Sequence, residues 1–169
     1  MRKLRLLLFA LVALLATAGS AAAGTNRNFV AHLSGDEEVP PRDTRAQGQA
    51  IFHLSKDGSS LEYKLIVANI DNVVAAHIHL APAGVNGPIV AFLAGPFAPG
   101  GGRTDGVLAT GTITAANLIG PLAGQPLSAL VDAMNAGNTY ANAHTNDGVD
   151  GTNTGPGDFP GGEIRGQIH

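Results

Sequence analysis

Short stretches in which apolar and polar residues alternate recur along most of this chain. Side chains of an extended strand point alternately to its two faces, so this alternation predicts strands with one buried face. Segments rich in Gly and Pro separate the stretches and predict turns. The stretches that predict strands are residues 28–33, 46–55, 61–67, 73–80, 89–94, 107–113, 140–145 and 163–168.

One stretch has the periodicity of a helix. Pro126 suits a first helical turn and Gly137 suits the stop, which predicts one short helix near residues 126–136. The apolar residues at helical spacing are Leu127, Leu130, Val131 and Met134. A single short helix among many short strands favours an all-β fold, namely an antiparallel, Greek-key-like β-sandwich or flattened barrel.

The start of the chain has the pattern of a signal peptide. A basic segment at residues 1–5 precedes a short apolar run at residues 6–16, and Ala21-Ala22-Ala23 offers a cleavage site. The run is too short to span a bilayer comfortably. We therefore expect residues 1–23 to be a signal peptide and residues 24–169 to form one secreted or periplasmic domain, with no membrane span.

Composition narrows the classes of partner. The chain has 10 basic and 13 acidic residues, and the predicted signal peptide contains three of the basic ones, so 7 basic against 13 acidic residues leave a charge near −6. Nucleic acids and anionic lipids bind basic surfaces, so neither is an expected partner. The chain has no cysteine, so an exported domain must be held by its core or by a bound ion.

The stretch from Val74 to Leu80 carries the chemistry that stands out most. Alternation places Val74, Ala76, Ile78 and Leu80 on one face and His77 and His79 on the other. The two imidazoles are then about 7 Å apart along the strand. Two such histidines can share a metal ion when a third ligand comes from a neighbouring strand.

A third candidate ligand lies in the stretch at residues 140–145. Tyr140, Asn142 and His144 share one face of that predicted strand. One hypothesis is a copper or zinc site formed by His77, His79 and His144, whose ring nitrogens would lie within about 4 Å of one another. The alternative is that all three are ordinary polar side chains on the solvated face of the sheet. His32, His53 and His169 each stand alone and are interpreted as surface residues.

A loop rich in Asn, Asp and Gly follows at residues 146–158. Its oxygen-rich character is typical of calcium loops, but it lacks the regular D-x-[DN]-x-[DN]-G spacing and the bidentate Glu at the twelfth position. A surface loop is the better interpretation, and no calcium site is predicted. No nucleophile elbow, phosphate loop or nucleotide fingerprint is present in the sequence, so nothing indicates acyl or phosphoryl transfer.

Five motifs, in this order, resemble the chordin-type (CHRD) domain family. They lie between residues 29 and 168, and a Gly- and Asp-rich insertion near residues 147–158 separates the last two more widely than is usual in the family. The motifs are Glu38-Val39-Pro40-Pro41, Ala76-His77-Ile78-His79, Gly84-Val85-Asn86-Gly87-Pro88, Tyr140-Ala141-Asn142-Ala143-His144-Thr145 and Gly162-Glu163-Ile164-Arg165-Gly166-Gln167-Ile168.

The resemblance implies a binding role. The domain is named from a developmental regulator that sequesters growth factors, and it also occurs alone in many secreted bacterial proteins. It is not an established enzyme family. The expected function is thus a non-enzymatic extracytoplasmic binding module that carries a copper or zinc ion, with an extracellular protein or small ligand as partner. A purely adhesive module without metal is a further alternative.

A weaker likeness is to Cu/Zn superoxide dismutase, another Greek-key β-sandwich. There, a His-x-His pair and a histidine on a later strand bind copper, and an arginine near the C-terminus guides the anionic substrate. By role, the three histidines and Arg165 would fill these positions. The chain lacks that family's zinc ligands and cysteines, so the likeness implies a copper-only redox protein as the rival function.

Three charged residues are expected to support the histidines. Glu163 and Glu38 are the candidate carboxylates that orient the imidazole rings, as carboxylates often do beside metal ligands. Glu163 and Arg165 lie two residues apart on one strand face. This spacing favours an ion pair or a bridge to the Glu38 loop, and the alternative for Arg165 is to steer a ligand.

Overall fold

The computed structural model of the chain describes residues 26–149 and 155–169. The predicted signal peptide at residues 1–23 lies outside the described residues, as do residues 150–154 of the predicted surface loop. Within the described ranges, no helix is long and apolar enough to cross a membrane.

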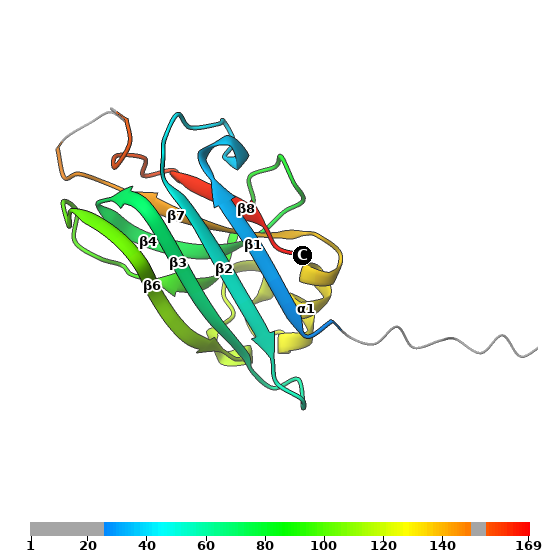
Figure 1. Cartoon of the computed structure of the whole chain (residues 1–169). Coiled ribbons are helices and arrows are strands. Elements are labelled where there is room, and N and C mark those ends of the chain that lie inside the picture. The colour runs from blue at the N-terminus through cyan, green and yellow to red at the C-terminus, as the bar shows by residue number, and fades with distance from the viewer. Residues whose placement is uncertain (1–25, 150–154) are drawn as a thin grey trace, which may run out of the picture.

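The described residues form the predicted all-β fold with one α-helix (Figure 1). Each predicted strand is present, and the helix α1 runs from Leu127 to Asn135, within the predicted range. The strands are β1 (Asn28–Ser34), β2 (Gln47–Leu54), β3 (Leu61–Asp71), β4 (Val73–Leu80), β5 (Ile89–Ala94), β6 (Arg103–Ile113), β7 (Thr139–Thr145) and β8 (Ile164–Gln167).

The eight strands make one antiparallel sheet that curls into a flattened, nearly closed barrel. Their order is β5-β4-β7-β8-β1-β2-β3-β6, so β5 and β6 are the two edges. In Figure 1, β1, β2, β3 and β6 lie in front of β4, β7 and their neighbours. Tyr63 on β3 crosses over Gly111 on β6, where a side chain would overlap its ring, and its hydroxyl donates to the Leu93 carbonyl on β5 at 2.7 Å. This hydrogen bond spans the seam between the edges.

Apolar side chains from both halves fill the inside of the barrel. Ala50, Phe52 and Leu54 are buried on β2, whereas Ile51 and His53 between them are exposed, as alternation predicts. On β4 the buried apolar residues are Val73, Ala76 and Ile78. Val74 is half-buried, because the ladder to β7 is irregular between Val73 and Ala75, and Leu80 is half-buried at the end of the strand. The predicted helix face, Leu127, Leu130, Val131 and Met134, is also buried in this core.

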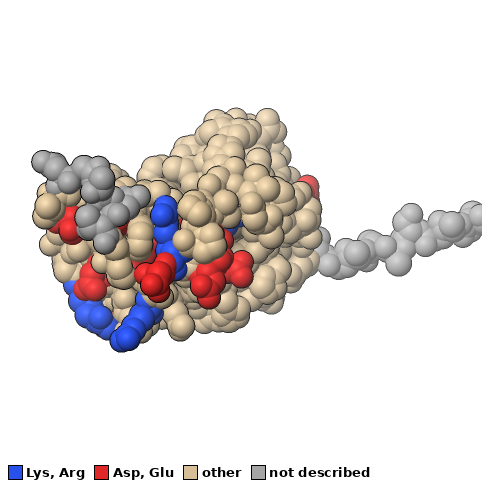
Figure 2. Space-filling model, turned by 90° about the horizontal axis from the view of Figure 1, so that it is seen from above, with Lys and Arg blue, Asp and Glu red and all other residues tan. Residues whose placement is uncertain are grey.

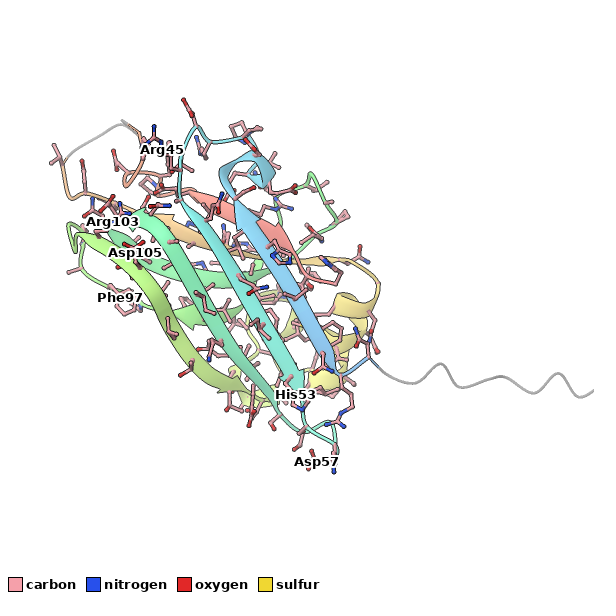
Figure 3. The ribbon with its side chains drawn as sticks, in the orientation of Figure 1. Arg45, His53, Asp57, Phe97, Arg103 and Asp105 are labelled. Carbon is pink, nitrogen blue, oxygen red and sulfur yellow. The ribbon has the colours of Figure 1, made fainter. Side chains whose placement is uncertain are left out.

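Two strands are longer than alternation predicts. β3 ends at Asp71 and β6 begins at Arg103, each four residues beyond the predicted strand. Asn69 has a positive φ of 56° within an irregular part of this ladder, and its N–H donates to Asp105 Oδ1 at 2.7 Å. Arg103 donates to Asn69 Oδ1 and to Asp105, beside which it lies in Figure 3. These side-chain bonds extend the pairing into a segment that was predicted as loop.

A second buried layer lies outside the barrel, over β4, β7 and β8, and it is polar. The loops at residues 35–46, 81–88 and 155–163 contribute partners to it, as the hydrogen bonds of Glu163 and Arg165 show. Its buried polar and aromatic side chains are Glu38, His77, His79, Tyr140, Asn142, Glu163 and Arg165. We call this set, together with the half-buried His144, the outer polar layer. Because each strand alternates, its residues lie between inward-facing apolar ones.

The Glu163 carboxylate joins three segments of this layer. It is fully buried and accepts hydrogen bonds from Thr44 Oγ1 at 2.6 Å, Thr145 Oγ1 at 2.7 Å and the Gly157 N–H at 2.9 Å. The guanidinium of Arg165 has other partners, in the 81–88 loop. Of the two expected contacts, the ion pair between Glu163 and Arg165 is therefore wrong, whereas the bond from Thr44 links Glu163 to the loop that carries Glu38, as the other one predicts. Two residues on one strand face can reach different loops, which spacing alone does not reveal.

Replacing Glu163 with Gln should lower the free energy of unfolding by about 2 kcal/mol, because a buried amide cannot accept all three hydrogen bonds. Urea unfolding at pH 7 measures the change. The matched control, Glu62→Gln, alters an exposed carboxylate on β3 and should change stability by less than about 0.5 kcal/mol. Equal effects of the two substitutions would contradict the anchoring role of Glu163.

Candidate metal centre

The three predicted ligand histidines come together in the outer polar layer. His77 and His79 lie on β4, and His144 lies on the adjacent antiparallel strand β7, where its register partner is Ala75. All three point away from the barrel core because their neighbours Ala76, Ile78 and Ala143 point into it. His77 and His79 are only 6% and 7% exposed, and His144 is half-buried.

The spacing of the rings is close to that of a shared ion. His77 Nδ1 and His144 Nε2 are 3.0 Å apart, and the candidate ligand nitrogens of all three residues lie within 4.8 Å of one another. Nitrogens bound to one tetrahedral ion at about 2.0–2.1 Å would be about 3.4 Å apart. The widest pair thus exceeds the expected limit of about 4 Å by less than 1 Å, a distance that rotation of a side chain can close.

Backbone carbonyls fix two of the rings. His79 Nδ1 lies 2.8 Å from the Gly87 carbonyl oxygen, and His144 Nδ1 lies 2.8 Å from that of Pro160. A carbonyl oxygen can only accept, so both Nδ1 atoms carry hydrogen, and in the neutral rings both Nε2 atoms have a free lone pair. Metal-bound histidines have this arrangement, in which the second nitrogen donates to a carbonyl or carboxylate.

The Nε2 lone pairs of His79 and His144 have too few hydrogen-bond donors around them. His79 Nε2 is buried and has no hydrogen-bond partner. His144 Nε2 has two neighbours at 3.0 Å, His77 Nδ1 and Asn142 Oδ1, and only the first can supply a hydrogen. Buried acceptors normally have partners, so a cluster of them facing one another fits a bound cation.

Burial keeps the imidazoles neutral. It lowers the pKa of His77 to about 4, with further lowering from the neighbouring His144 and His79. Burial also lowers the pKa of His79 and of His144, against the opposing effect of their bonds to Gly87 and Pro160. Neutral imidazoles are the form that binds metal, so at pH 7 the site does not have to lose protons from its rings first.

The Gly84–Pro88 turn holds His79 from one side. Tyr140 stacks on the His79 ring, with 4.7 Å between centroids and 8° between planes, and its hydroxyl accepts from the Gly87 N–H at 3.2 Å. Gly87 therefore contacts both rings through its backbone. A Cβ at Gly87 would overlap the Leu80 carbonyl, so only glycine allows this close approach.

Arg165 supports the same turn. It is 1% exposed, and its guanidinium lies 3.4 Å from the centre of the Tyr140 ring. It donates to the carbonyls of Pro82 and Val85 and to Asn86 Oδ1. The geometry favours the structural alternative for this residue, because a guanidinium with these partners does not face solvent to steer a ligand.

The two carboxylates lie apart from the imidazoles. Among the described residues, no hydrogen bond joins Glu38 or Glu163 to a histidine ring; the carbonyls of Gly87 and Pro160 take that place. Glu38 is 4% exposed, and burial raises its pKa to about 7 against the lowering effects of Arg165 and Arg42. It reaches the site only through Asn142, whose amide also lowers its pKa.

Sequence reasoning placed Asn142 and Tyr140 on the His144 face but assigned them no role. The register of β7 against β4 would have been needed, since it sets Asn142 opposite His77 and Tyr140 opposite His79. Phe92 on β5 was also missed. It is 46% exposed and meets the His77 ring edge-on, with 4.6 Å between centroids.

The remaining candidates stay outside this centre. His32, His53 and His169 are exposed, as predicted. In the described part of the predicted surface loop, Asn146 and Asp147 accept from the backbone of Gly148 and Val149, which are local turn contacts. Within residues 26–149 and 155–169, only His77, His79 and His144 form a group of three side chains that could hold a metal ion.

Comparison with known proteins places the chain in a family. No curated protein and no solved structure matches it. The family model of the CHRD domain matches residues 29–152, a range that contains Glu38, the Gly84–Pro88 turn and all three histidines. The motif at residues 162–168 lies beyond the end of the match. Because this family model covers most of the chain, the chain belongs to the CHRD domain family.

Proposed function

We propose that this CHRD domain is a non-enzymatic, extracytoplasmic binding module that holds one copper or zinc ion on His77, His79 and His144. The observation that carries the proposal is the unpartnered Nε2 of His79, buried beside two other imidazoles. An apolar side chain would be more stable at a buried position without a hydrogen-bond partner. A metal ion gives this nitrogen the partner that the protein does not.

The donor set supports copper or zinc. Three neutral imidazoles supply nitrogen ligands without any carboxylate, a set that suits borderline transition metals and not calcium or magnesium. The ligand nitrogens would be His77 Nδ1 and the Nε2 atoms of His79 and His144, because the other nitrogens of His79 and His144 donate to carbonyls. His77 would then carry its hydrogen on Nε2.

The surroundings support binding over redox catalysis. In the rival copper redox function, Arg165 would attract an anionic substrate, but its guanidinium is bound to three groups of the 81–88 loop.

The charges at the upper end of the barrel are mixed (Figure 2). A cleft of about 650 Å³ there is lined by Asp43, Arg45, Asp71 and Arg103, among others, which does not favour nucleic acid as a partner.

The purified mature protein should bind one equivalent of copper. His77→Ala and His144→Ala should each weaken binding by more than about a hundredfold, since loss of a ligand costs more than loss of a group that orients one. Metal analysis after dialysis and competition with a chelator measure the effect. The control is His53→Ala, at an exposed histidine near the opposite end of the barrel from Arg103 (Figure 3).

Unchanged copper content in both variants would contradict the three-histidine site. The same preparation separates the two functions: for a binding module, superoxide should decay in the presence of the copper-loaded protein no faster than in its absence. Faster decay that is lost in His144→Ala would instead establish the redox protein.

Metal binding should resist acidification more than an ordinary histidine site. Three imidazoles of pKa about 6.5 would each be half protonated at pH 6.5, and affinity would fall about eightfold from pH 8. Because burial lowers the pKa of these three, to about 4 for His77, we expect the loss to stay below the roughly fourfold that two ordinary imidazoles alone would give. Chelator competition at both pH values measures it, and an eightfold loss would contradict neutral, buried ligands.

The first 23 residues support export. A basic segment, a short apolar run and Ala21-Ala22-Ala23 precede Gly24. When the full chain is expressed in a bacterial host, N-terminal sequencing of the extracytoplasmic protein should begin at Gly24. Replacing Ala21 and Ala23 with bulky residues should leave an uncleaved precursor, and accumulation of full-length chain in the cytoplasm of the wild type would contradict the signal.

A further inference from the structure

Asn142 occupies the centre of the histidine cluster. It is 2% exposed, and on β7 it lies opposite His77 of β4 on one side and Arg165 of β8 on the other. Its Oδ1 is 3.0 Å from His144 Nε2. Because the His144 ring already donates from Nδ1 to Pro160, this is a contact between two acceptors when the ring is neutral.

The amide could relieve this contact by turning over, but Glu38 opposes that. A Cβ built on Gly162 would lie 2.8 Å from the carboxyl carbon of Glu38 and 3.0 Å from Asn142 Nδ2, so the carboxyl and the amide nitrogen flank the same point. Turning the amide would direct Oδ1 at a buried carboxyl. Glu38 Oε1 is buried and makes no hydrogen bond, so an amide hydrogen beside it is favoured over a further acceptor. Nδ2 therefore belongs beside Glu38.

With this orientation, three acceptor atoms face one another in a buried space: His79 Nε2, His144 Nε2 and Asn142 Oδ1. Within the described part of the chain, the donor in contact with these atoms is His77 Nδ1, and it can satisfy one of them. Turning the amide does not help, because it would place an acceptor beside Glu38 Oε1, which is buried and has no hydrogen-bond partner. A cation bound by these three acceptor atoms and by His77 as the fourth ligand satisfies all of these groups at once.

We propose that Asn142 Oδ1 is the fourth ligand of the ion and closes its coordination shell, a role that rests on the proposed metal site. Three nitrogens and one amide oxygen complete a four-coordinate site, and amide oxygens serve as weak ligands in copper proteins. Catalytic zinc and copper sites keep a position open for water or substrate, whereas sites that only hold an ion are closed. Asn142 thus makes this ion a bound component of the domain with no place for a substrate.

Copper(II) added to the purified mature protein tests the closed shell. A copper ion with an exchangeable water speeds the relaxation of solvent protons, and one with four protein ligands does so only weakly. We expect weak relaxation enhancement for the wild type and no change in its electron paramagnetic resonance spectrum with azide. Asn142→Ala should gain both an exchangeable water and an azide response, and should lose about tenfold in affinity.

The double variant Asn142→Asp with Glu38→Gln guards against misfolding of the alanine variant, because it keeps the shape and an oxygen donor and places an amide beside the second carboxylate oxygen. It should bind copper more tightly than the wild type and stay closed to water and azide. Asn135→Ala, at an exposed residue of α1, should behave as wild type in every measurement. Circular dichroism shows which variants are folded.

The outcomes separate the two proposals. If the wild type binds no copper, both fail. If it binds copper through the histidines but already has an exchangeable water, or if Asn142→Ala leaves water access, azide response and affinity unchanged, only the role of Asn142 is overturned.

Discussion

Two backbone carbonyls determine what the histidine cluster can do. The oxygens of Gly87 and Pro160 accept from His79 Nδ1 and His144 Nδ1, and each bond directs the opposite nitrogen into the same buried space. Both carbonyls belong to loops that cross the outer face of the sheet. The chemistry of the centre therefore depends on how these loops are held as much as on the strands that carry the imidazoles.

The outer polar layer supplies that support. Arg165 bonds the 81–88 loop and lies over Tyr140, which in turn stacks on His79, while Glu163 ties residues 44, 145 and 157 together. Both charges are almost fully buried, so they are stable only because hydrogen bonds replace their lost water. The hydrogen bonds of this layer hold the loops in place. Loops held in this way keep the imidazoles buried, and therefore neutral, and keep them directed at one another.

Much of this arrangement could be predicted because alternation encodes which face a residue occupies. Burial of Phe52 and Ile78, exposure of His53, the α1 boundaries and the union of His77, His79 and His144 all follow from such patterns. The partners of Glu163 and Arg165 could not be predicted, since they depend on loop paths and backbone carbonyls that carry no sequence signal. Asn142 lay between these cases: its face was evident, but its neighbour across the ladder was not.

The two buried layers explain how three imidazoles can face one another on so small a barrel. Side chains of β4 and β7 point alternately into these two layers. Ile78 and Ala143 therefore lie in the apolar core, whereas His77 and His144, one residue away, lie in the outer polar layer. Packing inside the barrel fixes the strand register without any contribution from the ligands. The cluster of unpaired acceptors, which would be costly in the core, is thus held by a core that does not contain it, and binding energy of an ion can offset that cost locally.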